Sequence, residues 1–203
     1  ASLGYKDQTG IFRYGNDSYS RLNATFNYNT AITKWLDFGV NFKYNDMRSD
    51  EPYKEGSSSE TWYYEVYRMF PTVPIFLPNG DYAGITIRKG VNSVIGTMAE
   101  SGRKTNKTQD FWYGAQFTLK PIKGLSIKGD FTQNQYYNTQ KAHKKTIYQT
   151  MPDREGGAIQ EENITPNGVT NNQEHEIYSV FNIWAEYQKS FAQNHKFQIM
   201  VGY

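Results

Sequence analysis

One stretch, Leu36 to Asp46, restricts most strongly what this chain can fold into. Its sequence LDFGVNFKYND alternates without exception: apolar side chains take every second place, and polar residues or glycine take the places between. Successive side chains of a β-strand point to opposite faces, so the stretch predicts a strand with one apolar and one polar face. The apolar face would meet a second sheet in a soluble sandwich, or lipid in an outer-membrane barrel whose polar face lines the lumen.

The same alternation recurs in residues 21–30, 110–120, 125–134, 177–188 and 196–203, and a less regular segment near Gly4 to Phe12 completes seven predicted strands. In a barrel, the lumen-facing residues would be Arg21, Asn23, Asn41, Lys43, Gln116, Lys128, Asp130 and Glu186. The lipid-facing residues would be Leu22, Phe26, Phe38, Val40, Phe42, Phe117, Ile127, Phe131, Ile183 and Ile199.

The predicted connections alternate between short and long. Tight turns of about four residues are expected at 32–35, 121–124 and 192–195, whereas residues 49–109 and 138–173 form long polar loops. Outer-membrane barrels are built with short periplasmic turns at one end and long extracellular loops at the other. Loops of that size are unusual inside a compact soluble domain. The pattern therefore favours an antiparallel transmembrane β-barrel, with residues 1–203 as part of one barrel domain.

Composition supports this choice by exclusion. The chain of 203 residues has 17 Tyr, 12 Phe and 4 Trp, yet its mean hydropathy is distinctly polar, as expected for strands that alternate aromatic and polar residues. No apolar run approaches the ~20 residues of a spanning helix, so a membrane protein of this kind must be a barrel. A net charge of +2 without a basic cluster gives no reason to expect nucleic acid, and the absence of cysteine excludes disulfides and thiol catalysis.

Two other classes remain open as alternatives. One is a secreted, aromatic-rich carbohydrate-binding β-sandwich, and the other is a β-rich glycoside hydrolase. A hydrolase needs two convergent acids ~5–9 Å apart, whereas the adjacent Glu161 and Glu162 diverge. The three histidines, His143, His175 and His195, lack any metal-ligand spacing. We therefore expect neither an enzyme nor a metal site nor a cofactor.

Several motifs occur in a specific order. The first part of the chain contains GYKDQTG, RLN, TKWL and GVN, followed by FPTVPIFLPNGDYAG, NSVIGTMAESGRK and LKPIKGLSIKGDFTQN. In this order and spacing the chain resembles the early barrel strands of SusC-like (RagA-like) TonB-dependent outer-membrane transporters. Many members of that family have Asn-Pro where this chain has Asn92-Ser93, so the match is looser there.

The resemblance implies a function as well as a fold. It implies TonB-dependent import of a large nutrient, an oligosaccharide or sometimes a peptide, across the outer membrane of a Gram-negative bacterium. A SusD-like surface lipoprotein would act as a lid, and TonB would act through a plug that these residues do not include. About seven strands would then belong to a barrel of ~22 strands, and the missing strands are expected before Ala1 and after Tyr203. Calcium occurs in some relatives, but no compact carboxylate loop here places it.

The first long loop offers candidate contact residues. Ser58 or Ser59 could cap a helix with Trp62, Val66 and Phe70 on one face, ended by Pro71. Asn79-Gly80 predicts a tight hairpin turn. Candidate contacts with a ligand or with the lid are Trp62, Tyr63, Tyr64, Asn79 and Asp81. The favoured alternative is that the three rings form a small core of the loop itself.

Strand-end aromatics have a separate predicted role. Tyr28, Trp35, Tyr44, Tyr136 and Tyr137 would suit girdles at the membrane interfaces. Packing against the turns is the alternative, particularly for Trp35.

Overall fold

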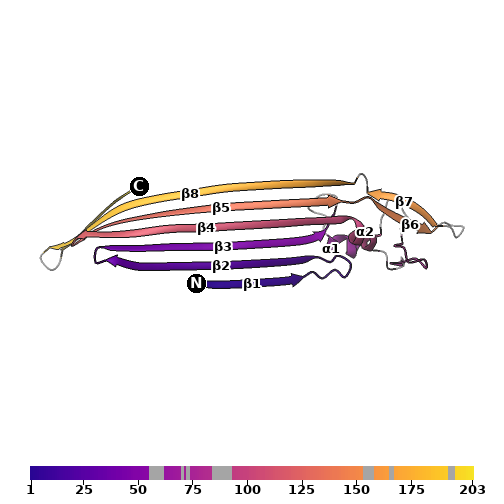
Figure 1. The fold of residues 1–203 in the computed structure, drawn as a ribbon, viewed down its shortest axis with the longest axis horizontal. Coiled ribbons are helices and arrows are strands. Elements are labelled where there is room, and N and C mark those ends of the chain that lie inside the picture. Colours follow the sequence, from indigo (N-terminus) through magenta and orange to yellow (C-terminus); the bar gives the residue numbers. More distant parts are fainter. Residues whose placement is uncertain are drawn as a thin grey trace.

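The chain forms one open antiparallel sheet with a small lobe at one end (Figure 1). The computed structural model describes residues 1–54, 62–69, 71, 74–83, 93–152, 158–164, 167–191 and 195–203. The sheet has seven strands in the order β1-β2-β3-β4-β5-β8-β9. Their bounds are β1 Ser2–Thr9, β2 Ser18–Thr33, β3 Leu36–Pro52, β4 Gly102–Ile122, β5 Leu125–Lys144, β8 Gly168–Phe191 and β9 His195–Gly202. The smaller elements are α1 Trp62–Tyr67, α2 Val94–Glu100 and the hairpin β6 Ile147–Pro152 with β7 Ala158–Ile164.

The structure is mostly β with an open antiparallel sheet, which confirms the prediction in that part, and the strands are longer than predicted. Strand β3 runs on to Pro52 and β4 begins at Gly102, inside what the sequence pattern predicted as loop. Pairing continues there because opposite charges face each other: Lys104 Nζ lies 3.2 Å from Glu51 Oε1, and the two residues are direct cross-strand partners. Likewise β5 extends to Lys144 and β8 begins at Gly168.

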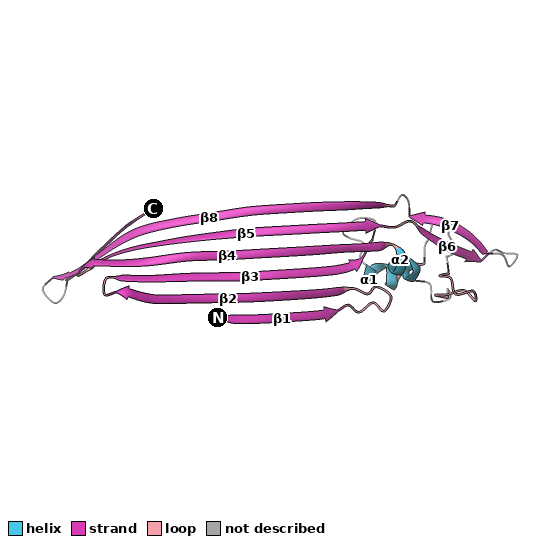
Figure 2. Cartoon of the chain, viewed as in Figure 1, coloured by secondary structure: helices cyan, strands magenta, loops and turns pink. Residues whose placement is uncertain are grey.

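Short and long connections lie at opposite ends of the sheet. In the β2–β3 turn, Lys34 and Trp35 lie between the two residues of the last pair, Thr33 and Leu36, and the register shifts at Ile32. The β4–β5 turn contains Gly124 at φ 89°, a conformation that glycine adopts without strain. Of the predicted third turn at 192–195, residues 192–194 lie outside the described residues, and His195 begins β9. Figure 2 shows both helices and the β6–β7 hairpin at the other end.

Two elements of that end were not predicted, namely α2 and the β6–β7 hairpin. Helix α2 begins after Ser93, whose side-chain oxygen accepts a hydrogen bond from Gly96 N at 3.1 Å, the arrangement of an N-cap. The hairpin lies within the second predicted loop, so that loop is partly ordered as strand. The predicted helix is present as α1, while its proposed caps Ser58 and Ser59 and its residue Phe70 lie outside the described residues.

The buried core of the described chain lies in the lobe and not in the sheet. Its buried hydrophobic residues are Ala83, Met98 and Ile147, and Ser101 is buried beside them with its Oγ donating to Tyr53 O at 2.5 Å. No large hydrophobic side chain of the seven described sheet strands is buried. None of the helices in the described part of the chain is long and apolar enough to cross a membrane.

Candidate functional site

The register of the sheet separates two chemically different faces. Directly opposed residues of antiparallel strands project to the same side, and Lys43 opposes Trp112 while Phe42 opposes Tyr113. Followed from strand to strand, the register puts Arg21, Asn23, Asn41, Lys43, Gln116, Lys128, Asp130 and Glu186 on one side, the polar face. It puts Leu22, Phe26, Phe38, Val40, Phe42, Phe117, Ile127, Phe131, Ile183 and Ile199 on the other side, the apolar face.

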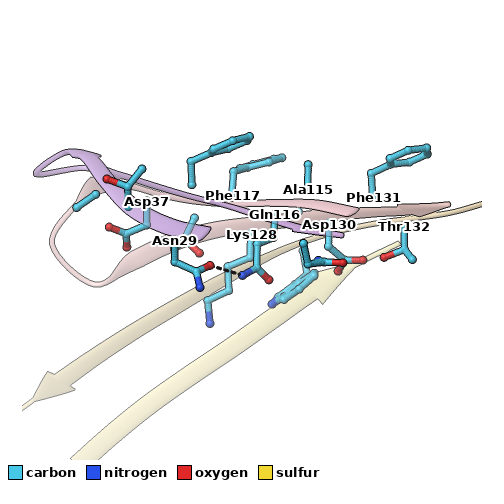
Figure 3. A pocket seen from close by; sticks show the side chains of 16 residues that line it. Asn29, Asp37, Ala115, Gln116, Phe117, Lys128, Asp130, Phe131 and Thr132 are labelled. Carbon is cyan, nitrogen blue, oxygen red and sulfur yellow. Dashed lines mark hydrogen bonds between the residues drawn. The ribbon is translucent and has the colours of Figure 1, made fainter. Parts of the chain in front are cut away.

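Figure 3 shows this separation in side chains. Gln116, Lys128 and Asp130 extend from one side of the sheet, and Phe117 and Phe131 extend from the other. The residues predicted to share a face therefore lie on the same side of the sheet, although they come from strands that are far apart in the sequence.

The apolar part of its face lies at different levels on strands that are far apart in the sheet. It spans Leu22–Tyr28 on β2 and Ile177–Tyr187 on β8. Through the register, the middle of the first stretch, Thr25, is level with Tyr178 of β8, whereas the middle of the second stretch is Asn182. The band thus moves four residues (182 − 178) over the four strand spacings from β2 to β8.

That shift defines an angle. Four residues at ~3.3 Å each, over four spacings of ~4.8 Å, correspond to an angle of roughly 35° between the strands and the direction across the band. The apolar band is therefore oblique to the strands, and its residues are open to the surroundings: Phe26 and Ile199 are 46% and 50% exposed.

The polar face contains a hollow of about 630 Å³ near the short turns. Its polar lining consists of Asn29, Asp37, Asn41, Gln116, Thr118, Lys128, Asp130, Thr132 and Trp184. Hydrogen bonds hold several of these side chains in place. Gln116 Nε2 donates to Asn29 Oδ1 at 3.0 Å, and Asn182 Nδ2 donates to Asp130 Oδ2 at 2.9 Å.

The amide pair depends on a glycine between its members. Gly39 of β3 lies between Asn29 of β2 and Gln116 of β4 in one row of the register. A Cβ on Gly39 would lie closer to both amide groups than any real Cβ does. The missing side chain therefore lets two amides two strands apart meet across β3.

The aromatic residues of α1 do not form the core that the favoured alternative predicted. Tyr63 and Tyr64 are 61% and 46% exposed, and α1 has no buried residue. Trp62 is partly buried, with its Nε1 donating to Pro52 O at 3.3 Å. The prediction of a ring core is wrong because α2 and β6 supply the buried residues instead, chiefly Met98.

Asn79 and Asp81 lie in the predicted turn. Asp81 N donates to Asn79 Oδ1 at 3.1 Å, and Asn79 Nδ2 donates to Asp81 Oδ2 at 2.8 Å, while Gly80 adopts φ 90°. The turn closes on one bridge, Phe76 with Tyr82, whose ring centroids are 5.0 Å apart.

Acidic groups crowd this turn. Partial burial raises the pKa of the Tyr82 hydroxyl, and the Glu100 carboxylate adds to the shift. Desolvation by the surrounding lobe raises the pKa of Glu100 itself, although the residue is exposed, and the nearby Asp81 carboxylate is the second cause.

The β1–β2 loop connects the two groups of predicted contact residues. Its Phe12 ring lies 5.0 Å from Tyr63, and its Tyr14 ring lies 6.1 Å from Phe76. Sequence reasoning missed this loop, although the alternate aromatics in IFRYG were a usable signal.

Arg103 of β4 holds the same loop against the sheet. Its Nε donates to Asp50 Oδ1 at 2.8 Å, and its terminal nitrogens donate to the backbone oxygens of Gly15 and Asn16. The exposed aromatic surface of Phe12, Tyr63 and their neighbours is thus assembled from separate segments and fixed by one guanidinium.

The strand-end aromatics divide between the faces. Tyr28, Tyr44 and Tyr137 lie on the apolar face, but Tyr136 opposes Asp110 and lies on the polar face. Its prediction as a girdle residue is wrong, because Tyr136 and Tyr137 are adjacent and cannot share a face.

The arrangement of His, Asp and Glu in the described ranges does not indicate a metal site. Among these residues, no group of three or more His, Asp or Glu is arranged to hold a metal ion. His175 instead stacks on Tyr137 with ring centroids 4.1 Å apart.

Comparison with known proteins found that no family model and no curated protein matches this chain.

Proposed function

We propose that the sheet is part of the wall of a transmembrane β-barrel, in a SusC-like TonB-dependent transporter of the outer membrane. The transporter would import a large nutrient, an oligosaccharide or a peptide, together with a SusD-like surface lipoprotein. One observation carries the membrane part of this proposal: the apolar band crosses the strands obliquely, while no large hydrophobic side chain of the seven described strands is buried.

The angle of the band distinguishes lipid from a packing partner. Strands of outer-membrane barrels tilt by ~35–45°, so the lipid-facing residues of successive strands must step along the register. In a sandwich, the inner faces of two aligned sheets interdigitate and their side chains become buried. Here no large hydrophobic residue of the described apolar face is buried, and Phe26, Phe181 and Ile199 are 46%, 53% and 50% exposed.

The ends of the strands fit the same orientation. Beyond Tyr44, β3 continues to Pro52 with mostly polar residues on both faces, as expected for a strand that has left the lipid on the loop side. The lobe at that end would be extracellular, where its exposed rings would be accessible to a ligand or to the lid. The short turns would face the periplasm.

The polar face would line the lumen, with paired charges and amides in contact with water or with the plug. Import then needs no bond-making chemistry from these residues. The assignment of TonB coupling, of the lipoprotein partner and of the cargo class is supported by the resemblance of the motifs GYKDQTG, TKWL and their successors.

Topology can be tested in cells that produce the full-length protein. Single cysteines are placed at Asn167, in the loop before β8, and at Lys123, in the β4–β5 turn. A membrane-impermeant maleimide should label Asn167→Cys on intact cells and Lys123→Cys only after the outer membrane is opened. Labelling of Lys123→Cys on intact cells would contradict the proposed orientation. Loss of uptake of at least one oligosaccharide or peptide on deletion of the gene tests transport itself.

A further inference from the structure

The apolar face ends in a line of aromatic rings on the side of the lobe. The ring centroids of Tyr44 on β3 and Phe111 on β4 are 4.6 Å apart, and those of Phe111 and Tyr137 on β5 are 6.2 Å apart. The ring of His175 on β8 stacks on Tyr137 at 4.1 Å. Aromatic rings gather where the hydrocarbon of a membrane meets its headgroups, so this line would mark that level on the sheet.

Basic side chains follow the line of rings at a constant offset. On β3, β4 and β5, the residue four places from the ring toward the lobe is Arg48, Lys107 and Lys141, respectively. An even offset keeps all three on the apolar face, and all three are exposed. Four residues at ~3.3 Å each and a ~35° tilt place them ~11 Å beyond the rings, and their long stems reach back toward the headgroups.

The register brings these three residues, the basic group, close to one another. Arg48 and Lys107 are direct cross-strand partners, and the Cβ atoms of such pairs lie ~4.5–5.5 Å apart. Lys141 lies two residues beyond Thr139, the direct partner of Lys107, which is the diagonal position at ~7–8 Å. Like charges in direct opposition destabilise a strand pair, so an anion between them would relieve this repulsion.

The carboxylates of this surface do not neutralise the basic group. Beyond the rings, the Lys, Arg, Asp and Glu residues on the apolar face of β2, β3, β4, β5 and β8 are Arg48, Arg103, Lys107, Lys141, Asp46 and Asp50. Asp46 lies 3.0 Å from Arg48 Nη2, and Asp50 lies 2.8 Å from Arg103 Nε. Two positive charges, those of the lysines, therefore remain in excess.

The basic group is accessible to a ligand. Within the described ranges, neither Lys107 nor Lys141 forms an ion pair with an Asp or Glu. Arg48 contributes as well, because its side chain remains 60% exposed while it holds Asp46. Asp7 of β1 lies in the same row as Arg48, but β2 separates the two. The three side chains therefore present a net positive surface next to the apolar band.

Charge and position together select the partner. On the membrane side of the basic group the face is apolar, and none of its large hydrophobic residues is buried in the described strands. An anionic lipid would contact both the charges and the band, whereas a soluble anion would contact the charges alone. We propose that Arg48, Lys107 and Lys141 bind the phosphate of an anionic lipid in the outer leaflet, with its acyl chains along the apolar band. The proposal rests on the proposed function, because this face meets lipid only as the wall of a barrel.

Lipid binding is measured by native mass spectrometry of the purified full-length protein in detergent. The protein is titrated with diphosphoryl lipid A, with dioleoylglycerol as a lipid without phosphate, and with inorganic phosphate as an anion without acyl chains. We expect lipid A to bind with the smallest dissociation constant. Lys107→Ala/Lys141→Ala should raise that constant about 10- to 30-fold, the effect of two basic residues near a lipid surface. Lys107→Arg/Lys141→Arg, which keeps both charges, should bind like the parent.

The matched control removes two lysines from the opposite face of the same sheet. Lys43 on β3 and Lys104 on β4 lie on the polar face, so Lys43→Ala/Lys104→Ala should bind lipid A like the parent. An equal loss of affinity in both alanine variants would show an effect of net charge alone and would overturn the site. Equal affinity of Lys107→Ala/Lys141→Ala and the parent would also overturn it, as would dioleoylglycerol or inorganic phosphate binding as tightly as lipid A.

The stability of two other variants separates this proposal from the barrel proposal. If Val40→Lys and Asn41→Lys are equally stable in lipid vesicles, the barrel proposal fails, and the lipid A titration still decides the basic group. If Val40→Lys alone loses stability but Lys107→Ala/Lys141→Ala binds lipid A like the parent, the barrel proposal stands and the lipid site is refuted.

Discussion

Replacement of Val40 by lysine tests the lipid-facing role of the apolar face most simply. Val40 is the middle residue of the apolar stretch Leu36–Tyr44 on β3, with Tyr28 and Ala115 as its direct partners. Four residues separate it from either end, which at ~3.3 Å per residue and a ~35° tilt is about 11 Å of depth. It is the position of this stretch from which a lysine is farthest from water.

The expected cost follows from that depth. Lysine on the lipid face near the bilayer midplane destabilises a barrel by about 2–4 kcal/mol, a change in the folding equilibrium of roughly 30- to 700-fold. The matched control is Asn41→Lys, one residue along the strand. Asn41 lies on the polar face opposite Asn27 and Gly114, so its replacement should change stability by less than about 0.5 kcal/mol.

The assay is urea unfolding of the full-length protein refolded into phospholipid vesicles, followed by tryptophan fluorescence. The midpoint should fall for Val40→Lys and stay constant for Asn41→Lys, with the same slope for both. Equal stability of the two variants would refute the reasoning, because the two faces would then meet the same solvent.

Three further predictions concern local features. Gly39→Val should lower the free energy of unfolding by about 1 kcal/mol or more, because its side chain displaces the hydrogen-bonded pair Asn29 and Gln116 across β3. The control is Gly168→Val: a Cβ at Gly168 meets no atom within 4 Å, so this variant should have a smaller effect in the same urea titration. Arg103→Ala should accelerate hydrogen exchange of the β1–β2 loop amides, while Lys104→Ala should not. Equal exchange rates in the two variants would contradict the role of Arg103 in holding this loop against the sheet. The pKa of the Glu100 carboxyl is raised in the folded lobe, so the protonated form stabilises the lobe below the ordinary pKa of 4.5, and this stabilisation is lost as pH rises through the higher folded value. Proteolysis of the lobe should therefore accelerate as pH rises over that window. Glu100→Gln should abolish the acceleration.

The faces of the sheet were predictable because they depend on a local rule. A period of two assigns Val40 and Asn41 to opposite sides whatever the neighbouring strands do. The strand ends were not predictable in this way, since alternation of apolar residues stops near Tyr44. Pairing beyond that point depends on residues distant in sequence, such as Glu51 with Lys104.

The lobe and the hollow could be predicted only in part. Helical spacing of Trp62 and Val66 indicated a helix, but spacing alone does not tell whether its rings face a core or water. The rings of Tyr63, Tyr64 and Tyr67 are exposed, whereas Trp62 is partly buried. The hollow brings together residues of five strands, including Asn29 and Trp184. That combination arises from the register, which no single segment encodes.

The central claim, an oblique lipid-contacting band, is tested most directly by site-directed spin labelling of the full-length protein in vesicles. Labels are scanned along β2 and β8, and their accessibility to oxygen and to a water-soluble nickel chelate gives depth. The account predicts a period of two on both strands, with depth maxima centred near residues 25 and 182, four residues apart in register. Maxima at the same register level, or no preference for oxygen on the apolar face, would contradict it.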